Sequence, residues 1–120
     1  MSKTGATGLK RICNAFVYSC QGLKSAFINE AAFRQEVVLA IILIPIALWV
    51  NVTIVERVMM ISSIGLIMVV ELLNSAVEAV VDRIGPEHHE LAGRAKDMGS
   101  AAVLVMMLIA GLIWVSILFF

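Results

Sequence analysis

Charged residues are distributed unevenly along this 120-residue chain, and two long stretches contain none. Residues 37–55 (VVLAIILIPIALWVNVTIV) and residues 98–120 are uncharged and largely apolar. At about 1.5 Å per residue, each stretch is long enough to cross a hydrocarbon layer about 30 Å thick. Residues 58–81 are equally apolar except for Glu71 and Glu78. The pattern therefore predicts three transmembrane helices.

The first 36 residues have a different pattern. Apolar residues such as Phe16, Leu23 and Phe27 recur at helical spacing, and basic residues lie between them. This pattern is typical of an amphipathic helix that lies in the membrane interface. We therefore expect an all-α integral membrane protein with one domain, 1–120. It comprises a surface-helix region (1–36), spans at 37–55, 58–81 and 98–120, and a loop at 82–97.

The overall composition supports a membrane protein. Hydrophobic residues make up 61% of the chain and charged residues 15%, and nine basic residues balance nine acidic ones. Soluble domains contain about 45–50% apolar residues, and a small one could not bury so large an apolar fraction. Nucleic-acid-binding proteins carry an excess of basic residues, which is absent here. The composition thus disfavours a soluble domain, a disordered segment and a nucleic-acid partner.

The basic residues also predict an orientation in the membrane. Five lie in the first 36 residues and three in the loop 82–97, whereas the connection between the first two spans contains only Arg57. Positively charged loops usually face the cytoplasm. We therefore expect the N-terminus and the loop 82–97 to be cytoplasmic and the C-terminus to lie across the membrane.

Polar residues in the second span form one stripe along the helix. Glu71, Asn74, Ser75, Glu78 and Asp82 fall on the same face, with Glu71 and Glu78 about 10.5 Å apart along the axis. Carboxylates inside a membrane are costly and usually functional. They could couple cations or relay protons in a transporter, or pair with basic residues across a subunit interface. The stripe clusters towards one leaflet, which favours chemistry at the interface over transport.

The loop 82–97 brings more charged residues to the same end of the helix. Lys96 and Asp97 stand at the start of the third span, where the helix amides add positive potential. Acidic groups could hold a metal ion while a lysine steadies a transferring phosphoryl group. This combination is typical of a site for magnesium and a polyphosphate, and Lys96 and Asp97 would have no obvious role in a transporter.

Three segments together resemble a known family. INEAAFRQE (28–36), ELLNSAVEAVVDRIG (71–85) and HELAGRAKDMGSAAVL (89–104) are similar to the signature blocks of the prokaryotic membrane diacylglycerol kinases. The resemblance implies a homotrimer in the bacterial inner membrane that phosphorylates diacylglycerol to phosphatidic acid with ATP and Mg²⁺. One alternative interpretation is an undecaprenol kinase of the same family. Alternatives of a different class are a small cation-coupled transporter that uses Glu71 and Glu78 and a non-catalytic lipid-binding protein.

The resemblance also implies roles for individual residues. Glu71 matches the general base, and Glu30 and Glu78 match the metal ligands. Asn74, Lys96 and Asp97 match residues that organise the phosphates and the active site. Contacts to the nucleotide are implied for Arg11, Tyr18, Glu30, Glu78, Glu87, His89, Lys96 and Asp97. Contacts to the lipid substrate are implied for Arg11, Ser19, Arg34, Gln35, Trp49, Glu71, Ser100 and Trp114.

Overall fold

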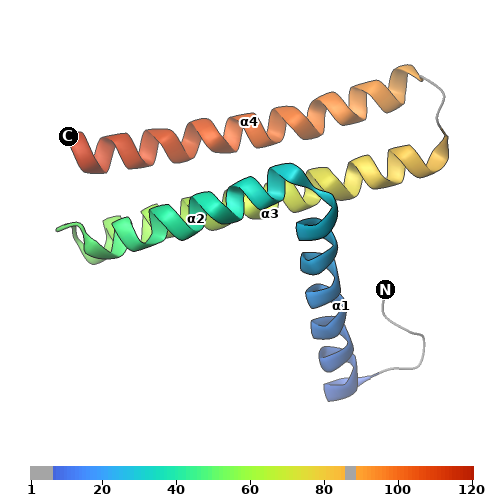
Figure 1. The fold of residues 1–120 in the computed structure, drawn as a ribbon, viewed down its shortest axis with the longest axis horizontal. Helices are drawn as coiled ribbons and strands as arrows, with labels where there is room; N and C mark the ends of the chain where they lie inside the picture. The colour runs from blue at the N-terminus through green and yellow to red at the C-terminus, as the bar shows by residue number, and fades with distance from the viewer. Residues whose placement is uncertain (1–6, 86–88) are drawn as a thin grey trace.

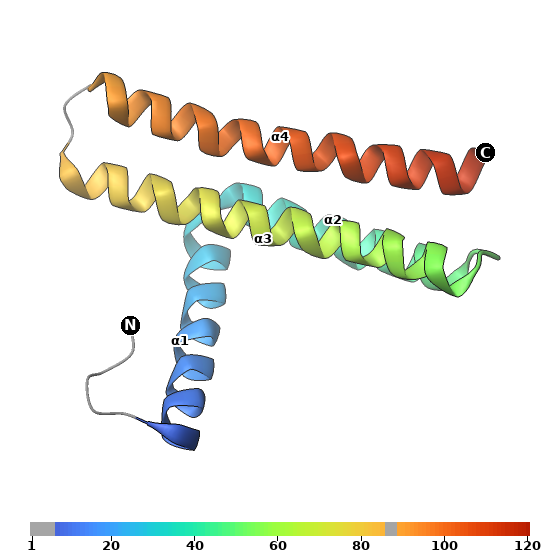
Figure 2. The ribbon, with the colours of Figure 1, turned by 180° about the vertical axis from the view of Figure 1, so that it is seen from behind.

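The structure is a computed structural model that describes residues 7–85 and 89–120. The described chain is helical, with short connections and no strand. Its helices are α1 (Gly8–Asn29), α2 (Ala31–Trp49), α3 (Ile54–Ile84) and α4 (Glu90–Phe119). Helices α2, α3 and α4 run side by side, and α1 projects crosswise from them (Figures 1 and 2).

The three expected spans are confirmed as long apolar helices. α2, α3 and α4 are each long and apolar enough to cross a membrane. α3 has 31 residues and α4 has 30, which gives each helix a length of about 45 Å. Because a hydrocarbon core is about 30 Å thick, the charged ends of α3 and α4 extend beyond it. The C-terminus lies at the opposite end of the bundle, beside the turn between α2 and α3 (Figure 1).

The boundary between the surface helix and the first span differs from the sequence expectation. The chain breaks at Glu30, whose backbone is extended (φ −116°, ψ 109°), and α2 starts at the next residue. The Arg34 guanidinium donates from Nη1 to the carbonyl oxygens of Phe27 (2.8 Å) and Ile28 (2.9 Å). These carbonyls belong to the last turn of α1, where no backbone N–H is available within the helix. Arg34 thus caps α1 from the first turn of α2.

The other helix ends follow local capping chemistry. α2 continues through Pro45 and ends at Trp49, so residues 50–53 belong to a turn. At the start of α3, Thr53 Oγ1 accepts from the Glu56 N–H (3.2 Å) and Glu56 Oε1 accepts from the Thr53 N–H (2.9 Å). This reciprocal capping box starts α3 at Ile54, ahead of the predicted span 58–81.

α3 is the central helix, because it packs against both α2 and α4. The buried core consists of Ala40 from α2, Ile64 and Ile67 from α3, and Ala110 from α4. Small residues at helix contacts let neighbouring backbones approach closely within a membrane. Around this core pack Leu43, Ile44, Met68, Met106 and Trp114.

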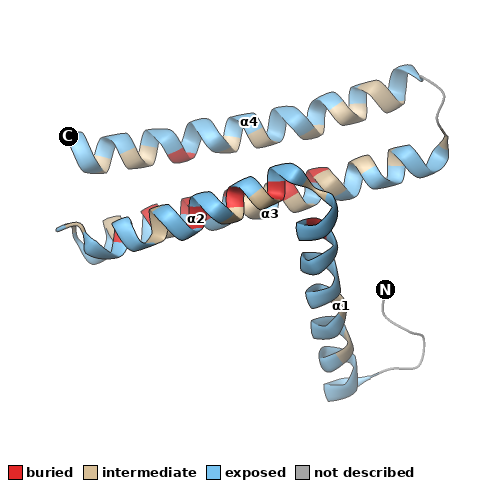
Figure 3. Cartoon of the chain, in the orientation of Figure 1, coloured by how far each residue is buried: buried red, intermediate tan, exposed pale blue. Residues whose placement is uncertain are grey.

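Most large apolar side chains point away from this core. The outer faces of α2, α3 and α4 are exposed along most of their length (Figure 3), for example at Ile41, Leu66 and Leu108. Such faces are typical of helices in contact with lipid or with other subunits. α1 likewise exposes Leu9, Phe16 and Phe27. Its role as an interfacial helix and the homotrimer both stay predictions.

Candidate active site

The polar stripe of α3 lines a cleft between α3, α4 and the start of α2. The cleft has a volume of about 370 Å³. Glu71, Asn74 and Glu78 line it from α3, Ser100 lines it from α4, and Glu30 lines it from the junction of α1 and α2. The structure therefore brings together five residues that the sequence assigned to one site. The remaining lining residues are apolar apart from backbone atoms: Ala32, Val103, Leu104 and Met107.

Glu71 is the most deeply placed carboxylate of the cleft. Its side chain is only 5% exposed, and its Oε2 accepts a hydrogen bond from Asn74 Nδ2 at 3.4 Å. Glu78 lies two turns along α3 towards the charged end and is half-buried. The stripe thus runs from a buried carboxylate to a more accessible one.

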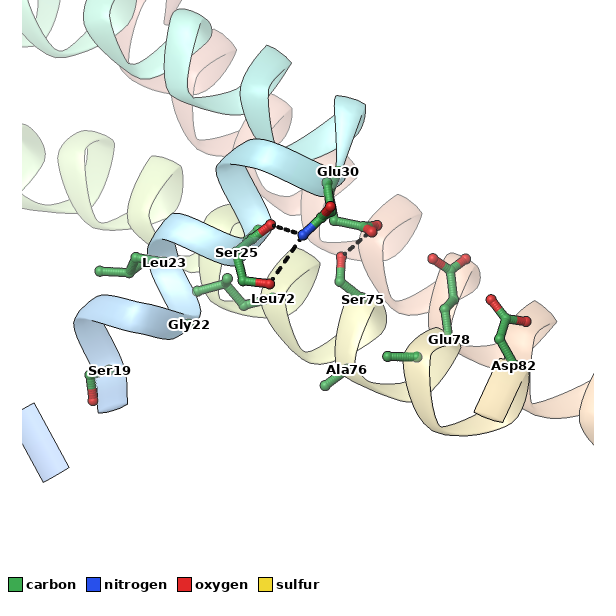
Figure 4. A pocket seen from close by; sticks show the side chains of 13 residues that line it. Ser19, Gly22, Leu23, Ser25, Glu30, Leu72, Ser75, Ala76, Glu78 and Asp82 are labelled. Atoms are coloured by element: carbon green, nitrogen blue, oxygen red, sulfur yellow. Dashed lines mark hydrogen bonds between the residues drawn. The ribbon is translucent and has the colours of Figure 1, made fainter. Parts of the chain in front are cut away.

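A second, larger recess lies between α1 and α3 (Figure 4). Its volume is about 830 Å³, and Glu30 and Glu78 line it as well as the cleft. Ser75 Oγ donates to Glu30 Oε1 at 3.2 Å, which ties the corner between α1 and α2 to α3. Ser19 lies at the far side of this recess, and Asp82 at its charged end (Figure 4). Glu30 and Glu78 therefore stand where the two recesses meet.

The carboxylates at this junction are suitable ligands for Mg²⁺. Within residues 7–85 and 89–120, three or more His, Cys, Asp or Glu side chains do not gather into a metal-binding group. Mg²⁺ usually keeps several water molecules and takes one or two carboxylates together with substrate phosphates, so it does not need such a cage. Glu30 accepts one hydrogen bond and retains further lone pairs. The pair Glu30 and Glu78 fits a magnesium ion that arrives with a polyphosphate.

Lys96 forms an ion pair at the charged end of the bundle. Its Nζ lies 2.7 Å from Asp82 Oδ1, which links α4 to α3. Lys96 precedes the uncharged part of α4 and lies outside the hydrocarbon region, and the Asp82 carboxylate raises the pKa of its amine. The neighbouring Asp97 is exposed. Asp82 lies four residues, or about one helical turn, beyond Glu78, so the Lys96 amine is held about one turn from Glu78 on the accessible side of the carboxylate stripe.

Several other predicted site residues have structural contacts of their own. His89 Nδ1 accepts from the Leu91 N–H at 3.0 Å and caps α4. Trp114 Nε1 donates to the Met60 carbonyl oxygen (3.2 Å) and to Ser63 Oγ (3.0 Å), so its indole is anchored to α3. Glu87 lies outside the described residues.

Some predicted contacts lie far from the cleft within one chain. Arg11 and Tyr18 are 19 and 12 residues before Glu30 on a straight helix, which places them about 28 and 18 Å from it along the axis. Trp49 is 85% exposed at the opposite end of α2. Gln35 is exposed on the first turns of α2. One chain alone does not bring Arg11, Tyr18 or Trp49 to the carboxylate cleft, and Gln35 is not among the residues that line it.

Two residues of the site, Glu36 and Gly99, were not predicted from the sequence. Glu36 is only 4% exposed and its carboxyl group contacts that of Glu71. Gly99 on α4 lies directly against the Asn74 side chain. For Glu36 a signal existed, because it shares a helix face with the buried residues Phe33 and Ala40.

The fold and the site define a class: a small helical membrane protein with a carboxylate cleft where its spans emerge at one charged end. Comparison with known sequences gives the family. Residues 17–118 match the sequence profile described as prokaryotic diacylglycerol kinase. The chain belongs to the prokaryotic diacylglycerol kinase family.

Individual relatives are similar over nearly their whole length. A diacylglycerol kinase of Haemophilus influenzae is 59% identical over 114 residues, which cover 95% of this chain and 97% of the relative. One of Escherichia coli (strain K12) is 57% identical over 112 residues, which cover 93% and 92%. One of Pseudomonas aeruginosa is 52% identical over 114 residues, which cover 95% and 93%. The family match favours a kinase over the cation-coupled transporter.

Proposed function

We propose that this protein transfers the γ-phosphoryl group of ATP to the hydroxyl group of diacylglycerol and so produces phosphatidic acid. One observation carries the proposal: a buried carboxylate, Glu71, lies in the same cleft as the more accessible Glu30 and Glu78. The relatives described as diacylglycerol kinases support it at up to 59% identity.

The arrangement suits a reaction between a water-soluble donor and a membrane-bound acceptor. ATP approaches from the charged end of α3 and α4, and the hydroxyl group of the lipid approaches from the membrane. The reacting groups then meet between Glu78 and Glu71. Holding both substrates in this order is the main contribution that a protein makes to phosphoryl transfer.

Glu71 acts as the general base in this proposal. It accepts the proton of the lipid hydroxyl group as the oxygen forms a bond to the γ-phosphorus and the bond to the ADP oxygen breaks. Asn74 orients Glu71 through the hydrogen bond between Nδ2 and Oε2. A base within hydrogen-bond reach of the hydroxyl group is the geometric requirement for this role.

Glu30 and Glu78 would hold Mg²⁺, which would supply positive charge to the phosphates. Lys96 and Asp97 organise the phosphates. For Lys96 this requires the amine to exchange its Asp82 partner for a phosphate oxygen. Arg11, Tyr18, Glu87 and His89 contact the nucleotide in this proposal. The lipid contacts are Arg11, Ser19, Arg34, Gln35, Trp49, Ser100 and Trp114.

The active protein is a homotrimer in this proposal. The distance of Arg11 and Tyr18 from Glu30 within one chain, and the exposed apolar faces of α2 to α4, both support assembly. It resides in the bacterial inner membrane with a cytoplasmic N-terminus and a periplasmic C-terminus. Native mass spectrometry from detergent should give three copies, and a monomer would contradict this part.

The decisive experiment measures phosphoryl transfer in mixed micelles. Purified protein is incubated with Mg²⁺ and γ-labelled ATP, and either dioleoylglycerol or undecaprenol is the acceptor. We expect the label in phosphatidic acid. Label in undecaprenyl phosphate alone would replace diacylglycerol by undecaprenol, and transfer to neither lipid would refute the kinase.

The Glu71→Gln variant tests the base. We expect turnover to fall by at least about 10²-fold because the amide cannot accept the proton, while the affinity for ATP stays within about twofold. Glu90→Gln is the matched control, since it neutralises a carboxylate at the charged end of α4 and should retain full turnover. Wild-type turnover in Glu71→Gln would remove Glu71 from the role of base.

A further inference from the structure

Glu36 is a buried acidic residue for which the proposed mechanism has no role. It lies on α2, one turn before the core residue Ala40, and is only 4% exposed. Its Oε1 atom is buried without a hydrogen-bond partner among the described residues. An unpartnered buried carboxylate is costly, so its retention calls for a physical reason.

The carboxyl group of Glu36 contacts the carboxyl group of Glu71. Both residues are nearly completely buried, and they come from neighbouring helices. Two ionised carboxylates only accept hydrogen bonds, and at contact distance they repel each other. One proton held between them turns the contact into a charge-assisted O–H···O hydrogen bond.

The position of Glu36 relative to the cleft separates its role from that of Glu71. Glu71 lines the cleft together with Asn74, whereas Glu36, on α2, is not among the residues that line it. Asn74 already contacts Glu71 Oε2. With Glu36 on α2 and Asn74 on α3, the Glu71 carboxylate is held by two neighbours.

We propose that Glu36 is a positioning residue that shares one proton with Glu71 and thereby fixes the Glu71 carboxylate towards the cleft. This inference rests on the proposed function, in which Glu71 is the base. The shared proton stays between the two carboxyl groups before the reaction. Glu71 then takes the proton of the lipid hydroxyl group on its other oxygen, and that proton leaves to water after the phosphorylated lipid and ADP depart.

Two substitutions at residue 36 separate positioning from packing. Glu36→Gln keeps the size and can donate from its amide to Glu71, whereas Glu36→Leu fills the space and donates nothing. We expect Glu36→Gln to retain kcat within about threefold and Glu36→Leu to lose about 10- to 100-fold, with KM for ATP unchanged in both. The apparent Tm of Glu36→Leu should equal or exceed that of the wild type, because an apolar side chain suits this buried position.

The control is Glu56→Gln, which also replaces a glutamate by glutamine but lies at the other end of α3 from the charged cleft. Glu56 is about 22 Å from Glu71 along the helix axis, and glutamine preserves the capping box. Its kcat and KM should match the wild type. All variants are assayed as full-length protein in mixed micelles with dioleoylglycerol, Mg²⁺ and ATP.

A second measurement does not depend on activity. Infrared difference spectra in H₂O and D₂O distinguish a protonated carboxyl group from a carboxylate. We expect a protonated-carboxyl band at neutral pH in the wild type that disappears in Glu36→Gln and Glu36→Leu and persists in Glu56→Gln.

Three results would overturn the inference: an undiminished kcat in Glu36→Leu, a Glu36→Gln variant as slow as Glu36→Leu, or no band that depends on Glu36. A wild-type protein that phosphorylates no lipid would instead refute the proposed function. The infrared band would then still report whether the two carboxyl groups share a proton.

Discussion

Asn74 on α3 lies directly against Gly99 on α4. A β-carbon at residue 99 would overlap Asn74 Oδ1 and would come within 3.2 Å of Asn74 Cγ. The missing side chain of Gly99 therefore makes room for the amide between the two helices. In that position Asn74 Nδ2 reaches Glu71 Oε2. The contact between α3 and α4 and the orientation of Glu71 thus depend on the same glycine.

The Gly99→Ala substitution should destabilise the protein by about 1–3 kcal/mol, because overpacking a close helix contact forces side chains or backbones apart. Phosphoryl transfer should fall at the same time, since Asn74 can no longer hold Glu71. The apparent Tm in detergent and the kcat for dioleoylglycerol measure the two effects.

Gly111→Ala provides the matched control, because a β-carbon at residue 111 of the same helix meets nothing within 4 Å. Its stability and turnover should equal those of the wild type. In the double variant Gly99→Ala/Asn74→Ala the apparent Tm should recover, since the overlapping amide is gone. A double variant as unstable as Gly99→Ala would show that the overlap is not the cause.

Asp82→Asn should strengthen ATP binding modestly. The substitution releases Lys96 from its ion pair, so the amine no longer exchanges one anionic partner for another when phosphate arrives. Because an exposed pair contributes little, the KM for ATP should fall by at most about fivefold. Asp82 raises the pKa of Lys96, so the lysine of the variant should lose its proton at a lower pH than the lysine of the wild type. As the pH is raised, kcat/KM for ATP should therefore begin to decline earlier in the variant.

Glu90→Gln removes one negative charge from the same end of the bundle without altering the Lys96 pair. A comparable fall in KM in that control would assign the effect to overall charge. An increase in KM for Asp82→Asn would contradict the competition between Asp82 and phosphate.

The sequence predicted the helices better than their ends. Two uncharged stretches and a third apolar stretch with only two carboxylates identify three spans, because charge is costly in hydrocarbon. These stretches mark where charges stop and not where a helix begins. The helix breaks at Glu30, where the backbone is extended, and Arg34 of the next helix caps the carbonyl groups that the break leaves unpaired. Capping from a distant turn has no simple sequence pattern.

The candidate site was predictable to the extent that it lies on one helix. The spacing of Glu71, Asn74 and Glu78 places them on one face whatever their neighbours are. By contrast, the contact of Glu36 with Glu71 and that of Gly99 with Asn74 depend on how helices pack. No sequence pattern specifies the register between helices, so the partner of Glu36 and the partner of Gly99 could not be assigned.

Glu30→Gln and Glu78→Gln should each raise the Mg²⁺ concentration needed for half-maximal turnover. An amide oxygen carries no charge and binds Mg²⁺ more weakly than a carboxylate, so excess Mg²⁺ should restore part of the lost activity. Titration of Mg²⁺ at saturating ATP measures the shift. Glu90→Gln should leave the titration unchanged, and an equal shift in that variant would rule out a specific role for Glu30 and Glu78.

Trp114→Phe should lower stability more than Trp49→Phe. The Trp114 indole N–H donates to α3 at the Met60 carbonyl oxygen and Ser63 Oγ, and phenylalanine lacks this donor. The loss should cost about 1 kcal/mol, because hydrogen bonds between membrane helices are individually modest. Trp49 is exposed on α2, and its replacement should change the apparent Tm little. Equal Tm values for the two variants in the same detergent would show that the indole contact to α3 contributes nothing to stability.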